Sequence, residues 1–233
     1  MCLNIHQTQQ KVQDNCTISF IHAQVSDVAK LATKIQKSIS DTSWINSLDI
    51  MAKLGYEARA KETIAKIVSG ILTNVVNPIS GDLGEIIVST QAQDLLVGHH
   101  RHNKIPLAEL WKEKKRGNPG FDFHTETPTN FIAFGEAKYN KNQSSHTIAI
   151  NQIVKFIENK KDIKELPDLD KWIGDKTKSN ISTFPDKSKA FTIAFSVHNK
   201  NYNEIFDNVI ASPKFSELLK YPEIYIVGIE FVN

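Results

Sequence analysis

The sequence predicts an α/β protein in which a mixed β-sheet is flanked by helices, preceded by a mostly helical N-terminal extension. After residue 80, amphipathic helices alternate with apolar strands, an order typical of such a sheet. Before residue 80, a single short strand is followed by helical periodicity. We therefore expect a strand and helical extension over residues 1–79 and an α/β domain over residues 80–233.

The N-terminal extension is predicted to hold one strand and two helices. The segment "CTISFIHA", residues 16–23, has the β-branched and aromatic residues of a strand. Ser26-Asp27 then begins a helix, because apolar residues recur on one face through Ile39. A longer helix is expected over about residues 56–77, ending at Asn77-Pro78.

The α/β domain is predicted from seven further segments. The Lys- and Asp-rich segment 160–189 is expected to be an exposed and partly mobile loop. The others are expected as helices at 82–97 and 146–159, and as strands at about 121–124, 130–138, 190–197 and 223–232.

The composition is that of an ordinary globular protein. The 233 residues are 40% hydrophobic and 23% charged, and no run of 18 apolar residues indicates a transmembrane helix. The polar N-terminus has no apolar core of a secretory signal, and the two cysteines form neither a disulfide framework nor a zinc cluster. We expect a cytoplasmic protein with reduced thiols. A net charge of +2 is too small to indicate nucleic-acid binding by itself.

The predicted strand at 130–138 raises a chemical question, because it ends in two charges. Strand alternation places Ile132, Phe134, Glu136 and Lys138 on one face. A carboxylate buried there needs a cation, a hydrogen-bond donor or a metal. The alternative is a strand that emerges from the core, with Glu136 and Lys138 forming a solvated pair at its end.

Asp122 favours a site over a surface pair. It lies in "GFDFH", where aspartate is disfavoured as a strand residue, and "TETPTN" can turn a hairpin that brings it beside Glu136 or Lys138. Converging carboxylates repel unless a divalent cation lies between them, and Mg²⁺ prefers such oxygen ligands. A neighbouring lysine can position or activate water, or neutralise charge on a phosphate. These groups are what phosphodiester hydrolysis requires.

"GFDF" followed by "FGEAKY" resembles the PD-(D/E)XK nuclease superfamily, with Asp122, Glu136 and Lys138 matching its motif residues. The likeness covers roughly residues 80–232 and implies a restriction-endonuclease-like fold. The superfamily often has a glutamate on the preceding helix, where Glu85 stands. Within it, "GDLGE", "GFDF" and "GEAKY" are similar to the HamA family of Hachiman anti-phage nuclease subunits. Two features depart from the pattern: no first core strand is evident between residues 97 and 120, and no proline precedes Asp122.

This resemblance implies a DNA nuclease that uses Mg²⁺ or Mn²⁺. Asp122, Glu136 and the Ala137 carbonyl would bind the metal, and Lys138 would act on the water. Glu85 would join the metal site, or would instead cap its helix through Asp82-x-x-Glu85. The HamA likeness further implies a HamB-like helicase partner in antiviral defence. The alternatives are a non-catalytic binding module that retains the fold, a stand-alone restriction-type endonuclease, and an unrelated α/β scaffold.

A basic stretch before Asp122 is the predicted DNA surface, since phosphates are the partner for such a patch. A run of charge is also typical of a solvated face. Gln152, on the helix after the Glu-x-Lys strand, is a candidate phosphate contact or a solvated helix residue. The predicted DNA-binding residues are Arg101, Lys112, Lys114, Lys115, Arg116 and Gln152.

Overall fold

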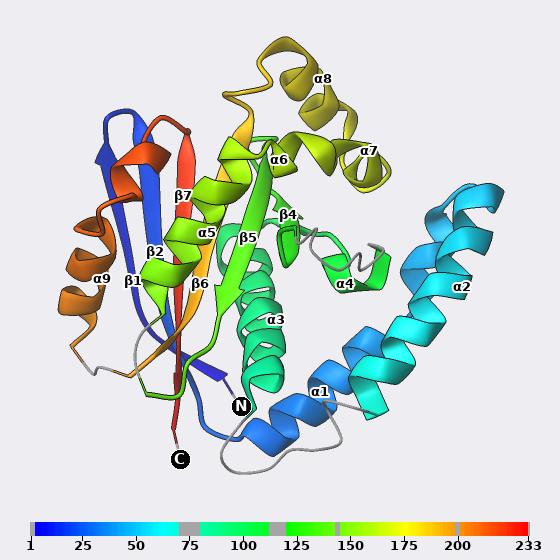
Figure 1. Ribbon diagram of the computed structural model, residues 1–233, viewed down its shortest axis with the longest axis horizontal. Coiled ribbons are helices and arrows are strands. Elements are labelled where there is room, and N and C mark those ends of the chain that lie inside the picture. The colour runs from blue at the N-terminus through cyan, green and yellow to red at the C-terminus, as the bar shows by residue number, and fades with distance from the viewer. Residues whose placement is uncertain (1–2, 70–79, 112–119, 143–144, 199–200, 233) are drawn as a thin grey trace.

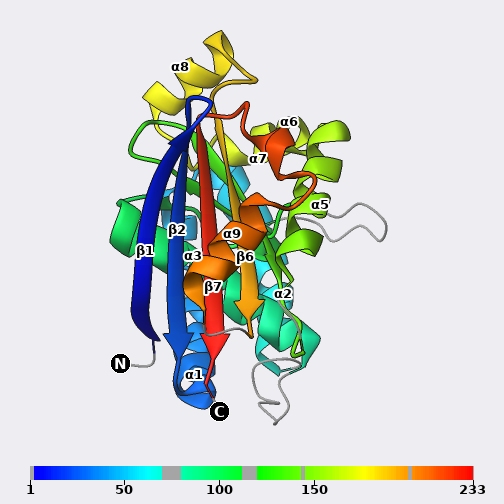
Figure 2. The ribbon, with the colours of Figure 1, turned by 90° about the vertical axis from the view of Figure 1, so that its left-hand side faces the viewer.

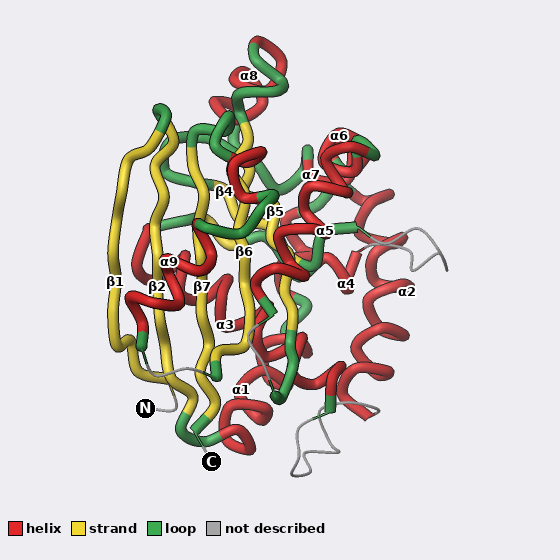
Figure 3. Tube along the Cα trace, turned by 60° about the vertical axis from the view of Figure 1, so that its left-hand side comes forward, coloured by secondary structure: helices red, strands yellow, loops and turns green. Residues whose placement is uncertain are grey.

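The protein is built on one mixed β-sheet. The computed structural model describes residues 3–69, 80–111, 120–142, 145–198 and 201–232. In these residues seven strands form one sheet with the order β1-β2-β7-β6-β5-β4-β3. Figure 3 shows the long strands β1, β2, β7 and β6 side by side. This confirms the predicted α/β class with a mixed sheet flanked by helices. The strands are β1 (Leu3–Gln13), β2 (Cys16–Val25), β3 (Asn103–Lys104), β4 (Phe123–Glu126), β5 (Ile132–Lys138), β6 (Lys189–Val197) and β7 (Glu223–Phe231).

The centre of the sheet is parallel and its two edges are antiparallel. Strands β2, β7, β6 and β5 run parallel to one another, whereas β1 pairs antiparallel with β2, and β4 with both β5 and β3. Parallel strands are covered on both faces, so they are continuously apolar rather than alternating. Every residue of β6 is buried accordingly.

Helices cover both faces of the sheet, as Figures 1 and 2 show. On one face, α5 and α9 pack over Phe20, Phe134 and Phe191. On the other, α1 and α3 pack over alanine and valine side chains such as Ala194 and Val227. The helices are α1 (Val28–Ser40), α2 (Ile50–Ile67), α3 (Gly81–His100), α4 (Ala108–Trp111), α5 (His146–Glu158), α6 (Lys161–Lys164), α7 (Leu166–Leu169), α8 (Asp175–Thr183) and α9 (Tyr202–Ile210), with 3-10 turns η1 (Ser43–Ser47) and η3 (Phe215–Leu218).

The N-terminus begins with a β-hairpin, so the predicted mostly helical extension is wrong. Strand β1 escaped prediction because it is polar and lies at the sheet edge, where most of its side chains are exposed. Asp14 and Asn15 connect it to β2 with φ of 51° and 66°, the positive values of a tight hairpin turn. Since β2 pairs with β7, the hairpin belongs to the same sheet as residues after 80.

The predicted mobile loop at 160–189 is also wrong, because this segment forms α6, α7 and α8. The Lys189 ammonium lies 2.5 Å from the Asp162 carboxylate, and both side chains are buried. The Glu126 carboxylate accepts hydrogen bonds from the Gly174 backbone N–H at 2.8 Å and the Thr177 hydroxyl at 2.5 Å. Buried polar contacts therefore fix a segment that is highly charged overall.

The other predicted helices are present with shifted ends. The buried face of α1 holds Leu31, Ala32, Ile35 and Ile39, as its periodicity predicted. Helix α2 begins earlier, because Asp49 caps it by accepting from two backbone N–H groups. Residues 70–77 of that predicted helix lie outside the described residues. Among the helices described here, none combines the length and the apolar character needed to cross a membrane.

Candidate active site

The predicted site lies where β5 loses its neighbour on one side. Strand β6 pairs with β5 as far as Lys138, but β4 begins only at Phe123, opposite Gly135. Beyond Gly135, no described strand pairs with β5 on the side toward β4. The N–H and C=O of one strand residue point to the same side, so both polar backbone groups of Ala137 face that side.

Asp122 fills the open edge with its side chain. It precedes β4, and its backbone N–H donates to the Gly135 carbonyl at 2.9 Å. Its carboxylate accepts from the Ala137 N–H at 2.8 Å. The structure thus brings Asp122 to the strand of Glu136 and Lys138, as the hairpin predicted. The Ala137 carbonyl, the predicted backbone ligand, lies on the same edge of β5 as that N–H.

Glu136 is the buried charge of this site. Its side chain is 0% exposed, and its Oε1 lies 2.6 Å from the Lys138 ammonium. Its Oε2 has no hydrogen-bond partner among the described residues. Burial raises the pKa of Glu136 well above its ordinary value, the Asp122 and Glu85 carboxylates add to the rise, and Lys138 opposes it. Lys138 therefore offsets only part of the cost of burying the Glu136 charge beside two other carboxylates, and a divalent cation would offset more of it.

Lys138 bridges two carboxylates from different elements. Its side chain is 16% exposed, and its ammonium lies 3.8 Å from Glu85 Oε1 as well as 2.6 Å from Glu136. Burial acts to lower the pKa of Lys138, but the surrounding carboxylates, Glu136 foremost, outweigh burial and raise it. Lys138 is therefore a cation at neutral pH, which suits it to hold water or to neutralise negative charge.

Glu85 does not cap its helix. The N-cap of α3 is Ser80, whose hydroxyl accepts from the Leu83 N–H at 3.3 Å, so the predicted Asp82-x-x-Glu85 box is not formed. Instead Glu85 points to Lys138 from the second turn of α3, with 43% of its side chain exposed. The structure brings Glu85 to the site as a partner of the lysine.

Two glycines to which the sequence patterns assigned no role, Gly84 and Gly135, bring these elements together. A Cβ on Gly84 would overlap the ring of Tyr139, so the missing side chain lets α3 approach the end of β5. A Cβ on Gly135 would overlap the ring of Phe123, next to Asp122. A glycine inside a helix or strand is the sequence signal for such a close approach.

Two of the predicted DNA-binding residues, Arg101 and Gln152, lie in the described part of the chain. Arg101 caps the far end of α3 with a φ of 58°, roughly 24 Å along the helix from Glu85. Gln152 lines a surface hollow of about 380 Å³ on α5, together with Ile148 and Lys155. The remaining predicted contacts, Lys112, Lys114, Lys115 and Arg116, lie outside the described residues.

The metal-ligating potential of the site rests on two carboxylates and one carbonyl. Within the described part of the chain, no group of three or more His, Cys, Asp or Glu side chains is arranged to hold a metal. Mg²⁺ usually binds one or two protein carboxylates and keeps several waters or phosphate oxygens, so Asp122, Glu136 and the Ala137 carbonyl are a fitting donor set.

Comparisons with known proteins assign no family. No protein-family model matches this chain, and no curated protein matches it closely enough to be called a relative.

Proposed function

We propose that this protein is a DNA nuclease that hydrolyses phosphodiester bonds with Mg²⁺ or Mn²⁺. The observation that carries the proposal is the fully buried Glu136 carboxylate, whose Oε2 lacks a partner among the described residues while Asp122 lies beside it. A buried charge of this kind is costly unless it coordinates a metal or is paired. The motif resemblance supports the same residues.

The residues have separate tasks in this proposal. Asp122, Glu136 and the Ala137 carbonyl hold the cation, which when bound supplies charge neutralisation to the scissile phosphate. Lys138, protonated at neutral pH, holds the attacking water and stabilises negative charge that develops on the phosphate. Glu85 fixes the position of the Lys138 ammonium from α3.

Metal binding tests the site without requiring the right DNA substrate. Mn²⁺ should raise the melting temperature of the wild-type protein, because a ligand that binds only the folded state stabilises it. Glu136→Gln should melt normally without metal and should not respond to Mn²⁺. Glu217→Gln, a surface carboxylate on η3, is the matched control and should respond like wild type. If Mn²⁺ raises the melting temperature of Glu136→Gln as much as that of wild type, the proposed metal site is wrong.

A non-catalytic binding module is the second candidate, and one observation favours it. The Asp122 carboxylate is already occupied by the Ala137 N–H, and Lys138 already compensates Glu136 in part. These contacts would give the three residues a purely structural role. In that case metal should change neither the melting temperature nor DNA integrity, whereas DNA binding would persist.

From the HamA likeness we further propose that this nuclease acts with a helicase in antiviral defence. The helices of the first 79 residues are the proposed docking surface, and α2 exposes Ile50, Met51 and Leu54 on it. Deleting residues 1–55 would remove β1 and β2 from the sheet and disturb the fold. This deletion therefore cannot test docking. Changing Ile50, Met51 and Leu54 to serine should instead prevent co-purification with a helicase encoded beside the gene. Vigorous unselective cleavage by the chain alone would favour a stand-alone restriction-type enzyme.

A further inference from the structure

The described sheet ends in two edge strands of very different length. One edge is β3, with 2 residues, and the other is β1, with 11 residues. The outer side of an edge strand carries backbone N–H and C=O groups without a neighbouring strand, so it can pair with another chain. Natural proteins prevent such pairing with short edge strands, charged side chains, proline, bulges or a covering helix.

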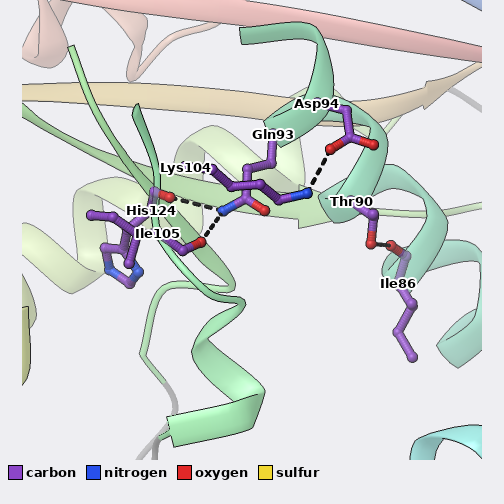
Figure 4. Close-up of polar contacts among 7 residues, drawn as sticks. All are labelled: Ile86, Thr90, Gln93, Asp94, Lys104, Ile105 and His124. Atoms are coloured by element: carbon purple, nitrogen blue, oxygen red, sulfur yellow. Dashed lines mark hydrogen bonds and ion pairs between the residues drawn. The ribbon is translucent and has the colours of Figure 1, made fainter. Parts of the chain in front are cut away.

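The β3 edge is protected in three of these ways. It is short, Lys104 on it is charged and exposed, and α3 covers the backbone beside it. The Lys104 ammonium lies 2.6 Å from the Asp94 carboxylate of α3. The Gln93 amide nitrogen, also from α3, donates to the Ile105 carbonyl at 2.6 Å and the His124 carbonyl at 2.9 Å, as Figure 4 shows. A helix therefore already satisfies backbone groups at this edge.

The β1 edge is long, nearly uncharged and held in place. Its segment "LNIHQTQQKVQ" has no proline, aspartate or glutamate, and Lys11 is its one lysine or arginine. A bulge at His6, which has no partner on β2, interrupts the ladder near its start. The Asn203 side chain of α9 accepts from the Gln7 amide at 3.2 Å and the Gln9 amide at 2.9 Å. In Figure 2, β1 forms the margin of the sheet, and no described strand pairs with its outer side.

Two exposed apolar side chains lie on the same face of β1. Ile5 is 45% exposed and Val12 is 70% exposed. Ile5 lies opposite Ala23 of β2 and Val12 lies opposite Thr17, and these two β2 residues share a face because they are an even number of positions apart. A further strand at this edge would cover both apolar side chains.

Ile5 and Val12 are placed symmetrically about Gln9. Three ladder positions separate Gln9 from Val12, and three separate it from Ile5, because the bulged residue does not pair. An antiparallel copy of β1, related by a two-fold axis at Gln9, therefore places Ile5 of each copy opposite Val12 of the other. The same register places Lys11 opposite Gln7, so no like charges lie directly opposite each other.

We propose that two copies of this chain pair antiparallel along β1, so that their sheets join into one. The positions of Ile5 and Val12 select a second copy as the partner, because β1 is complementary to itself in this register. Strands β2, β7 and β6 separate β1 from β5, so the pairing leaves the carboxylate site of each copy free. This inference goes beyond the proposed nuclease activity and stands without it.

The oligomeric state of the full-length protein tests the inference. Sedimentation velocity at micromolar to millimolar concentrations should show the wild type passing from monomer to dimer as the concentration rises. Ile5→Lys combined with Val12→Lys should weaken dimerisation by about tenfold or more, because lysine then lies opposite lysine at two symmetric places. Both positions are exposed, and circular dichroism checks that the variant is folded.

A charge exchange tests the register itself. Ile5→Glu combined with Val12→Lys should dimerise more strongly than the double-lysine variant at low salt, because opposite charges then lie across the same two places. Met51→Lys combined with Leu54→Lys is the matched control, since it adds two lysines at exposed apolar positions of α2, far from β1 in Figures 1 and 2. This control should dimerise like wild type.

Three results would overturn the proposal. A wild type that stays monomeric over the whole range would leave the β1 edge to a strand of another protein. A double-lysine variant that dimerises as strongly as wild type would place the contact elsewhere. A glutamate–lysine variant no stronger than the double-lysine variant would reject the pairing of Ile5 with Val12.

Discussion

The carboxylate of Asp122 accepts a hydrogen bond from the backbone N–H of Ala137 at 2.8 Å. This contact joins the segment before β4 to the middle residue of Glu-Ala-Lys, at a point where no strand among the described residues pairs with β5 on that side. One side chain thus satisfies an open strand edge and brings a second negative charge near Glu136. The structural and the proposed catalytic roles of Asp122 can be separated by mutation.

Asp122→Asn and Asp122→Ala should therefore differ in stability but not in activity. The amide oxygen of asparagine can still accept from Ala137, whereas alanine leaves that N–H without its partner, at a cost of roughly 1–3 kcal/mol. Both variants lose the carboxylate and should lose cleavage. Urea unfolding and a DNA cleavage assay measure the two effects. Retained cleavage in Asp122→Asn would exclude this carboxylate from the reaction.

Gly84→Ala should disturb the site by moving α3, although Gly84 itself has no side chain in the site. The added methyl group meets the Tyr139 ring, so α3 must move away from the end of β5 and Glu85 from Lys138. We expect reduced cleavage and lower thermal stability. Gly98→Ala is the matched control on the same helix, because a Cβ there meets nothing within 4 Å, and it should be neutral or stabilise by up to about 1 kcal/mol. Equal behaviour of the two variants would show that the close approach at Gly84 has no role.

Sequence patterns predicted the helices and strands whose buried side chains recur at a regular spacing. The apolar strands β6 and β7 and the amphipathic helix α1 were located closely, because their side chains face a core on a regular repeat. Strand β1 was missed, since an edge strand with exposed side chains has no such repeat. The helices of 161–183 were missed because individual buried contacts, such as Asp162 with Lys189, decide their position.

The candidate site was predictable for a different reason. Charges at the end of an apolar strand are costly when buried, so Glu136 and Lys138 stood out by residue type alone. The approach of Glu85 could not be derived from spacing, because it depends on the contact between Gly84 and Tyr139. The position of Arg101 far along α3 likewise depends on where that helix ends.

Breaking the Lys189–Asp162 pair should destabilise the fold strongly. Both side chains are nearly inaccessible, so Lys189→Met leaves the Asp162 carboxylate buried without its main cation, at a cost of about 3–5 kcal/mol. Asp162→Leu combined with Lys189→Met should recover part of that loss. Lys178→Met, which removes an exposed pair with Asp170, should cost at most about 1 kcal/mol. Chemical denaturation measures all three, and a small effect of Lys189→Met would contradict the buried pair.

His102 should make the protein less stable in acid. Burial, aided by His100, lowers the pKa of His102 from 6.5 to about 3, so the folded state binds its proton less readily than the unfolded state. The stability from neutral His102 is complete above pH 6.5 and is lost as the pH falls toward 3, by about 1.4 kcal/mol per pH unit for one proton. His102→Gln should flatten this dependence. The exposed neighbour His99, changed to Gln, should leave it unaltered, and identical slopes for both variants would reject the assignment.

The basic segment before Asp122 should set the salt dependence of DNA binding. Each cation in contact with a phosphate releases counterions, so changing Lys112, Lys114, Lys115 and Arg116 to glutamine should weaken binding and flatten its dependence on salt. Arg101→Gln, at the far end of α3, should have a smaller effect. Binding isotherms at several salt concentrations provide the slopes. If the fourfold variant shows the same salt dependence as wild type, the segment is a solvated surface that does not contact DNA.

The rate of Mn²⁺-dependent DNA cleavage by wild type and by Glu136→Gln tests the central claim most directly. The proposal predicts slow cleavage by the isolated wild-type chain that requires Mn²⁺ or Mg²⁺ and stops when the metal is chelated. It predicts no cleavage above background by Glu136→Gln, which keeps the shape of the buried side chain and removes its charge. Cleavage by Glu136→Gln at the wild-type rate, or wild-type cleavage that persists without metal, would contradict a nuclease centred on Glu136.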